Sequence, residues 1–303
     1  MGSGVRRIAL WGVVVLVVGG AVAVAVGSQA GQGAPSTARS VESPSAQPSP
    51  TPTPTPTPTL RGEPADTAAY DLGALPVADV FAINPRLPLD DDPDAPTTGL
   101  VAQPREAAAP VFDREGGEPV AQLPREQPYG GSVVPVIEEH DHWVRVLLTG
   151  RQALPGDGDP AQVTGWLRTA DVDLTRNPHR VEVDLSETTV RIVTDDGSGE
   201  QETIVADDFA WGTEATPTPL GRSFVMFVDV VEEFAYTEGN PLVYLSVQSP
   251  TLPGFGGQPV AVTAFHYHAY RSGAISNGCL RVSAEATAVL SELPLGTPVH
   301  IRA

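Results

Sequence analysis

The segment that most restricts the possible folds of this chain is Ile275-Ser276-Asn277-Gly278-Cys279-Leu280-Arg281-Val282. It contains the only cysteine of the 303 residues, directly after a glycine and before a short apolar run. Upstream, the strand-like segment Ala264-Phe265-His266-Tyr267-His268 offers an imidazole. A thiol becomes a useful nucleophile when a nearby base takes its proton, so Cys279 and His266 are a candidate catalytic pair.

The composition favours β structure. Aromatic residues make up only 6% of the sequence, which contains 30 glycines and 31 prolines, while valine and threonine recur in short runs. These features favour small strands joined by turns over long helices.

The formal net charge is −19, and no basic cluster follows the first seven residues, which argues against a nucleic acid as a partner. A single cysteine forms no internal disulfide, so the folded part depends on packing.

Residues 1–30 are expected to target the chain to the membrane. Arg6 and Arg7 precede the uncharged run 8–26, which is long enough to cross a bilayer as a helix. The arginines keep the amino end inside the cell, so everything after the run is placed outside the cytoplasm. The run is either a retained anchor in the cytoplasmic membrane or a cleaved signal peptide, because Ser28-Gln29-Ala30 resembles a small-residue cleavage site.

Residues 31–98 are interpreted as a stalk and connector. Their first part is rich in Ser, Pro and Thr and ends in a Thr-Pro alternation at 50–59, which cannot bury a core and favours an extended conformation. The acidic run from Asp90 to Asp94 is expected to be solvated rather than metal-binding. The apolar patch Val80-Phe81-Ala82-Ile83 is expected to dock on a neighbouring domain.

Residues 99–176 alternate short strands with glycine-rich turns, which predicts a small β-barrel. The expected strands are 110–112, 120–123, 133–137, 143–148 and 163–167. A Trp-Val-(charged)-Val strand at Trp143, followed by Gly-Trp-Leu at Trp166, resembles bacterial SH3-like domains. We expect both tryptophans to serve the core or a strand end rather than a ligand groove.

From 180 to 303 the sequence predicts a second β domain. Strands are expected at 181–186, 189–193, 243–247 and 264–268, with a strand entered near 222–225 and a hairpin turn at 195–197. The one convincing helix is Ala284 to Leu293, with Ser283 as its N-cap and with Val289, Leu290 and Leu293 on one face.

This second domain resembles the L,D-transpeptidase catalytic domain of the YkuD type. Five segments carry the resemblance in the family's order: VEVDLSETTVRIV at 181–193, TEATPTPLGRSFV at 213–225, AFHYH at 264–268, ISNGCLRV at 275–282 and LGTPVHI at 295–301. The resemblance implies a mainly β chain, in which a small SH3-like barrel is followed by a YkuD-type β-sandwich with one or two short helices.

The resemblance also implies an activity. Enzymes of this family attack the carbonyl of a peptidoglycan tetrapeptide stem with a cysteine and pass the acyl group to an amine of another stem, forming a 3-3 crosslink. Peptidoglycan stem peptides and carbapenem-type inhibitors are then the expected ligands, and no cofactor is expected. No cluster in the sequence has the spacing of a zinc site.

Residue by residue, Cys279 corresponds to the family's nucleophile and His266 to its base. The backbone N–H groups of Asn277 and Gly278 are expected to stabilise the oxyanion. The expected substrate-binding residues are Ser276, Arg281, Tyr267 and His268.

The sequence departs from the family at two of these positions: Tyr267 replaces a usual glycine, and Asn277 a frequent histidine. The Tyr267 side chain is expected to crowd or shape the pocket. His268 is an alternative base, since residues two apart on a strand share a face. His266 is preferred because it leaves the longer lid before Ser276.

Three other functions stay open on the same residues. Water as the acceptor would give an L,D-carboxypeptidase, and a protein amine as the acceptor would give an enzyme that attaches proteins to the wall. The third is a wall-binding scaffold with an inactive second domain.

Overall fold

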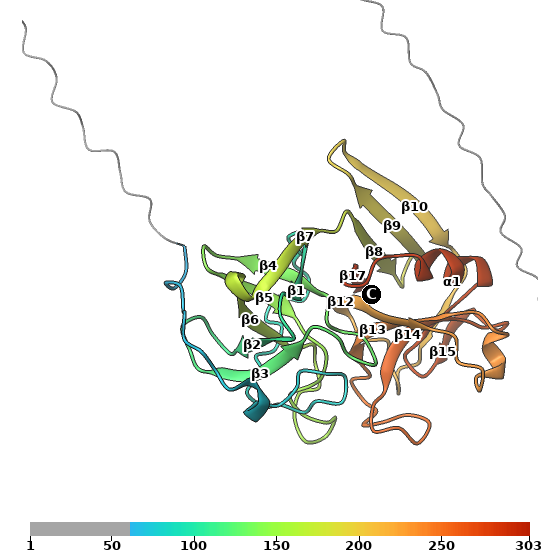
Figure 1. The fold of residues 1–303 in the computed structure, drawn as a ribbon. Coiled ribbons are helices and arrows are strands. Elements are labelled where there is room, and N and C mark those ends of the chain that lie inside the picture. The colour runs from blue at the N-terminus through green and yellow to red at the C-terminus, as the bar shows by residue number, and fades with distance from the viewer. Residues whose placement is uncertain (1–60) are drawn as a thin grey trace, which may run out of the picture. The chain divides into compact units, whose positions relative to one another are not determined.

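The computed structural model describes residues 61–303. The chain is mainly β, as the sequence predicts, with a 7-stranded and a 10-stranded sheet and, among the described residues, one α-helix (Figure 1). The expected membrane segment 8–26 and the Thr-Pro alternation at 50–59 lie outside the described residues. Within 61–303, no helix has both the length and the apolar character of a membrane span.

The first sheet has the strand order β3-β2-β6-β5-β4-β1-β7. Its strands are β1 Leu100–Pro104, β2 Ala108–Phe112, β3 Pro119–Pro124, β4 Val134–Glu139, β5 Trp143–Leu147, β6 Thr164–Arg168 and β7 Val172–Arg176. Trp143 is fully buried, and its ring meets that of Phe112 edge-on at 5.0 Å between centroids. Its indole N–H donates to the carbonyl of Pro64 at 3.2 Å, so Trp143 serves the core, as expected. The SH3-like character of this sheet stays a prediction.

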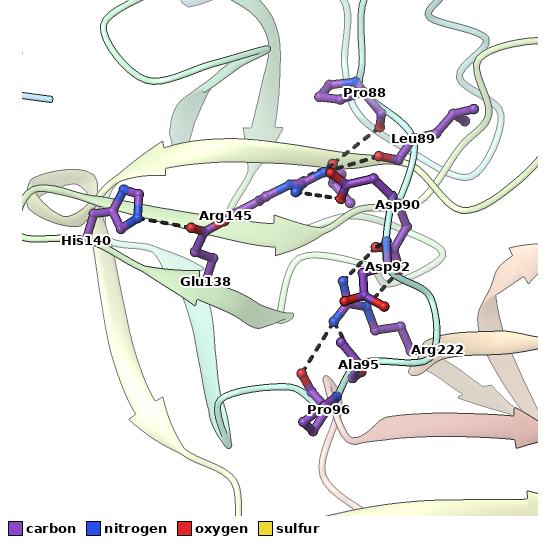
Figure 2. Close-up of polar contacts among 12 residues, drawn as sticks. Pro88, Leu89, Asp90, Asp92, Ala95, Pro96, Glu138, His140, Arg145 and Arg222 are labelled. Carbon is purple, nitrogen blue, oxygen red and sulfur yellow. Dashed lines mark hydrogen bonds and ion pairs between the residues drawn. The ribbon is translucent and has the colours of Figure 1, made fainter. Parts of the chain in front are cut away.

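Residues 61–98 pack along the first sheet. Ala78, Val80 and Leu87 are buried in its core, so the apolar patch docks through Val80 as expected. The acidic run is not uniformly solvated, which corrects the sequence-based interpretation. Asp90 and Arg222 form an ion pair at 2.6 Å with side chains only 2% and 5% exposed (Figure 2). This pair ties the segment to the second sheet.

The second sheet has the order β10-β9-β8-β17-β12-β13-β14-β16-β11-β15. Its strands are β8 His179–Asp184, β9 Thr189–Asp195, β10 Glu200–Ala206, β11 Ala210–Gly212, β12 Gly221–Asp229, β13 Leu242–Gln248, β14 Val262–Tyr267, β15 Gly273–Ser276, β16 Leu280–Val282 and β17 Pro298–Arg302. The expected hairpin at 195–197 joins β9 and β10, which project from the rest of the sheet (Figure 1).

Helix α1, Ala284–Ser291, follows β16 directly. Ser283 caps it as predicted, because its hydroxyl accepts the amide N–H of Ala286 at 3.1 Å. Leu290 is buried in the core of the second sheet and Leu293 packs against that core. The placement of Val289 on the same face was wrong: it is 47% exposed, since the helix turns it toward solvent.

The two sheets are bound to each other through β12. Phe224 and Met226, although they belong to the second sheet, are buried in the core of the first. Near them, the buried Ser246 hydroxyl donates to the Gln162 side chain at 2.8 Å. The first sheet therefore supports the second through β12, and Val262 at the start of β14 also packs against the core of the first sheet.

Candidate active site

Parallel pairing of β14 and β16 assembles the site. In this ladder Phe265 lies opposite Leu280 and His266 opposite Arg281. Cys279 immediately precedes β16, so it lies one step back along the same side of the ladder as Arg281. A pocket of about 140 Å³ collects the two predicted catalytic residues with six others, Tyr236, Phe255, His268, Ser276, Asn277 and Arg281.

The turn that carries the thiol is built around the buried hydroxyl of Ser276. This hydroxyl accepts the amide N–H of Gly278 at 3.1 Å and donates to the carbonyl of Cys279 at 2.5 Å. The φ of Gly278 is +104°, a conformation that favours glycine. The Gly278 amide is therefore already engaged, and its expected role as an oxyanion donor has to be corrected.

The Thr-Pro segment after β11 holds this turn from behind. The hydroxyl of Thr216 donates to the carbonyl of Ser276 at 3.2 Å, and that of Thr218 donates to the carbonyl of Gly278 at 2.9 Å. Thr218 also accepts the amide of Gly212 at 2.9 Å. Two carbonyls of the nucleophile turn are thus fixed by side chains from another part of the chain, which rigidifies the turn.

His266 is set up as a neutral base. Its Nδ1 lies 2.9 Å from the carbonyl oxygen of Tyr267. A carbonyl only accepts, so Nδ1 carries the proton and Nε2 keeps a free lone pair. Burial lowers the pKa of His266 to about 4, and the charge of Arg281 adds to the effect. At neutral pH the imidazole is therefore uncharged and able to take a proton at Nε2.

His268 has the opposite tautomer. The amide N–H of Tyr270 donates to its Nδ1 at 2.9 Å, so Nδ1 is unprotonated and the neutral ring carries its proton on Nε2. The ring centroids of His266 and His268 are 6.3 Å apart. Burial and the charge of Arg281 lower the pKa of His268. The hydrogen bonds therefore leave Nε2 of His266 free to accept a proton, whereas Nε2 of neutral His268 is a donor.

Burial raises the pKa of the Cys279 thiol, an effect that the amide of Ala264 and the charge of Arg281 oppose. The sulfur lies 3.9 Å from the carbonyl of Val262. A neutral thiol that shares a pocket with a neutral imidazole is suited to proton exchange during a reaction rather than to a preformed ion pair.

Residues 178–301 match YkuD, the L,D-transpeptidase catalytic domain. The matched range contains every described residue that lines the pocket, and also strands β14 and β16.

Solved L,D-transpeptidases resemble the chain as well. One from Mycobacterium smegmatis has 15% identity, covers 58% of this chain and 96% of its own, and gives a TM-score of 0.31. One from Mycobacterium tuberculosis H37Rv has 17% identity with the same coverages and a TM-score of 0.29. One from Stackebrandtia nassauensis has 15% identity, covers 43% of this chain and 57% of its own, and gives a TM-score of 0.29. A search of curated proteins returned no match.

Among the described residues that line the pocket, Arg281 is the only arginine or lysine. Its Nε is buried and has no hydrogen-bond partner among residues 61–303. A guanidinium that lines a pocket is suited to a carboxylate of a ligand. The Nε2–H of His268 is a second donor lining the same pocket.

The expectation for the Tyr267 side chain has to be corrected. Tyr267 follows His266 on β14, so its side chain points to the other face, and it is absent from the described residues that line the pocket. The contribution of Tyr267 is its backbone carbonyl, which orients the imidazole of His266.

Sequence reasoning missed two pocket residues, Tyr236 and Phe255. Tyr236 lies on the short 3-10 helix Ala235–Thr237, and its ring contacts that of His266 edge-on at 5.3 Å between centroids. Phe255 lies in the glycine-rich loop before β14. The glycines of that loop were a usable signal, whereas nothing in the local sequence marks Tyr236.

Proposed function

We propose that this protein is an L,D-transpeptidase that forms 3-3 crosslinks in peptidoglycan outside the cytoplasm. The observation that carries the proposal is the pocket that Cys279 and a neutral His266 both line, within the segment that matches the YkuD family. Residues 8–26 would tether the enzyme to the membrane, and the segment up to residue 59 would hold it at the wall.

In the first half-reaction, Cys279 Sγ attacks the carbonyl of the third residue of a tetrapeptide stem. The thiol proton passes to Nε2 of His266, and His266 returns it to the departing D-alanine amine. The product is a thioester on Cys279. The amides of Asn277 and Cys279 donate to no other group within residues 61–303, so they are the available donors for the oxyanion.

In the second half-reaction, the side-chain amine of another stem attacks the thioester and loses a proton to His266. The new amide is the crosslink, and the thiol is restored. Arg281 and His268 would hold the α-carboxylate that adjoins the scissile bond, since both are donors without an acceptor in the described structure.

Defined muropeptides test the proposal. Purified 61–303 is incubated with disaccharide-tetrapeptides, and the products are read by mass spectrometry. A crosslinked dimer supports transpeptidation, whereas a tripeptide alone would identify a carboxypeptidase. A carbapenem adduct that disappears in Cys279→Ala supports the nucleophile, and folded wild-type protein that forms no adduct contradicts the enzymatic proposal.

A further inference from the structure

Arg151, just after the first sheet's β5, is a buried arginine whose hydrogen bonds go to backbone carbonyls. It is 2% exposed. Its guanidinium donates to Leu252 at 3.3 Å, to Pro253 at 2.9 Å and to Pro259 at 3.5 Å. Burying a guanidinium is costly unless its donors are satisfied, so these carbonyls determine where the side chain can lie.

The three carbonyls belong to one loop, residues 249–261, which leads from β13 into the histidine strand β14. Pro253 and Pro259 flank a tight turn in which Phe255 pairs with Gln258. Arg151 therefore donates hydrogen bonds to both ends of the turn that carries Phe255. The tip has little other support, since Phe255 is 53% exposed and Gly256 and Gly257 have positive φ values of 59° and 83°.

The turn held by Arg151 forms one wall of the candidate catalytic pocket, because Phe255 lines this pocket together with His266 and Cys279. The same loop is also tied to the support of the nucleophile turn. The hydroxyl of Thr251 donates to the carbonyl of Ala215 at 3.0 Å, in the Thr-Pro segment that fixes Ser276 and Gly278. A displacement of the loop 249–261 would therefore move both the Phe255 side of the pocket and the segment that supports the turn around Cys279.

We propose that Arg151 is a positioning residue for the catalytic pocket, which acts by fixing the loop 249–261 and with it the Phe255 wall over Cys279. Arg151, which lies before the matched range 178–301, then influences catalysis by holding one wall of the pocket. The inference rests on the proposed function, since it concerns the shape of the site for the stem peptide. It requires that loss of Arg151 loosens donor binding more than it harms the fold.

Arg151→Met tests this with Arg145→Met as the matched control. Arg145 lies on the neighbouring strand β5 and contacts Leu89 (Figure 2). Its other partners, Asp91 and Thr164, are likewise outside the loop 249–261. Arg151→Met should raise KM for the tetrapeptide donor on the order of tenfold with a smaller change in kcat, and should speed hydrogen exchange within 249–261. Arg145→Met should leave both unchanged, and Arg151→Lys should restore part of the lost affinity.

A double-mutant cycle with Phe255→Ala shows whether Arg151 acts through the wall. The exposed Phe255 can be truncated without harming the core, and its loss should raise KM similarly; the double variant should then be little worse than either single variant. Additive effects, or an unchanged KM in folded Arg151→Met or in Phe255→Ala, would overturn the inference. Wild-type protein that forms no carbapenem adduct would instead overturn the proposed function, while the exchange measurement on 249–261 would still judge whether Arg151 holds the loop.

Discussion

His266 donates its Nδ1–H to the carbonyl oxygen of Tyr267, 2.9 Å away, and this bond decides which ring nitrogen is free to act as a base. The neighbouring residue in sequence thus contributes through its backbone alone. Together with burial, which lowers the pKa of His266 to about 4, the bond presents a neutral imidazole with Nε2 available.

The first prediction concerns the pH dependence of acylation. Above about pH 4, His266 is neutral and can take the proton of Cys279; below it, the ring is charged and cannot. The rate of carbapenem acylation should therefore stay on its plateau through pH 6.5 and fall only near pH 4. A stopped-flow profile with its acid midpoint at the ordinary histidine value of about 6.5 would contradict the buried, neutral base.

The same shift predicts how folding stability depends on pH. The unfolded chain binds a proton at His266 near pH 6.5, but the folded protein does so only near pH 4, so stability is lost as the pH falls through this window. The contribution is up to about 3 kcal/mol. Urea unfolding at pH 7 and pH 4.5 should give a smaller difference for His266→Asn than for wild type. Equal differences would mean that His266 titrates normally in the folded state.

A further prediction concerns the turn around the thiol. Ser276→Ala removes the hydroxyl that links the Gly278 amide to the Cys279 carbonyl, leaving both groups without that partner. Unfolding free energy should fall by about 1–3 kcal/mol, and acylation should slow because Cys279 is less well positioned. Calorimetry and adduct kinetics measure the two effects. Ser291→Ala, an exposed helical serine, is the control and should change neither.

The sequence predicted most of the strands because these depend on local patterns, and its two candidate catalytic residues, Cys279 and His266, line one pocket. Strand β10 was missed, since the side chains from Glu200 to Ile204 are exposed and show no apolar alternation. The engagement of the Gly278 amide could not be predicted, because it depends on how the Ser276 hydroxyl turns within the loop. Pairs between distant residues could not be predicted from the sequence either, since Asp90 and Arg222 are separated by 132 positions.

That buried pair yields a prediction about stability. Asp90→Asn leaves the guanidinium of Arg222 buried without its counter-charge, although the carbonyls of Ala95 and Pro96 still accept from it. The expected loss is about 3–5 kcal/mol of unfolding free energy. The double variant Asp90→Leu with Arg222→Met should recover much of this, since it removes both charges. If chemical denaturation finds Asp90→Asn as stable as wild type, the pair contributes nothing.

The last prediction tests the anion site formed by Arg281 and His268. If Arg281 holds the α-carboxylate beside the scissile bond, a tetrapeptide ending in a free acid should be a better donor than its carboxamide, by roughly 10-fold or more for a charged hydrogen bond of about 1.5–3 kcal/mol. Arg281→Gln should lose most of this preference, because the amide side chain offers no charge.

The design of that experiment uses Arg271→Gln as its control, since Arg271 lies in the same region but is paired with Asp208 at 2.9 Å. The ratio of kcat/KM for acid and amide donors is compared among the three proteins, so that a general loss of activity cancels. His268→Phe, which removes the Nε2–H, should shift the ratio in the same direction as Arg281→Gln and by less, because a neutral donor contributes less than a charged one. If the ratio is the same for wild type and Arg281→Gln, Arg281 does not bind the α-carboxylate of the donor and only supports the turn after Cys279.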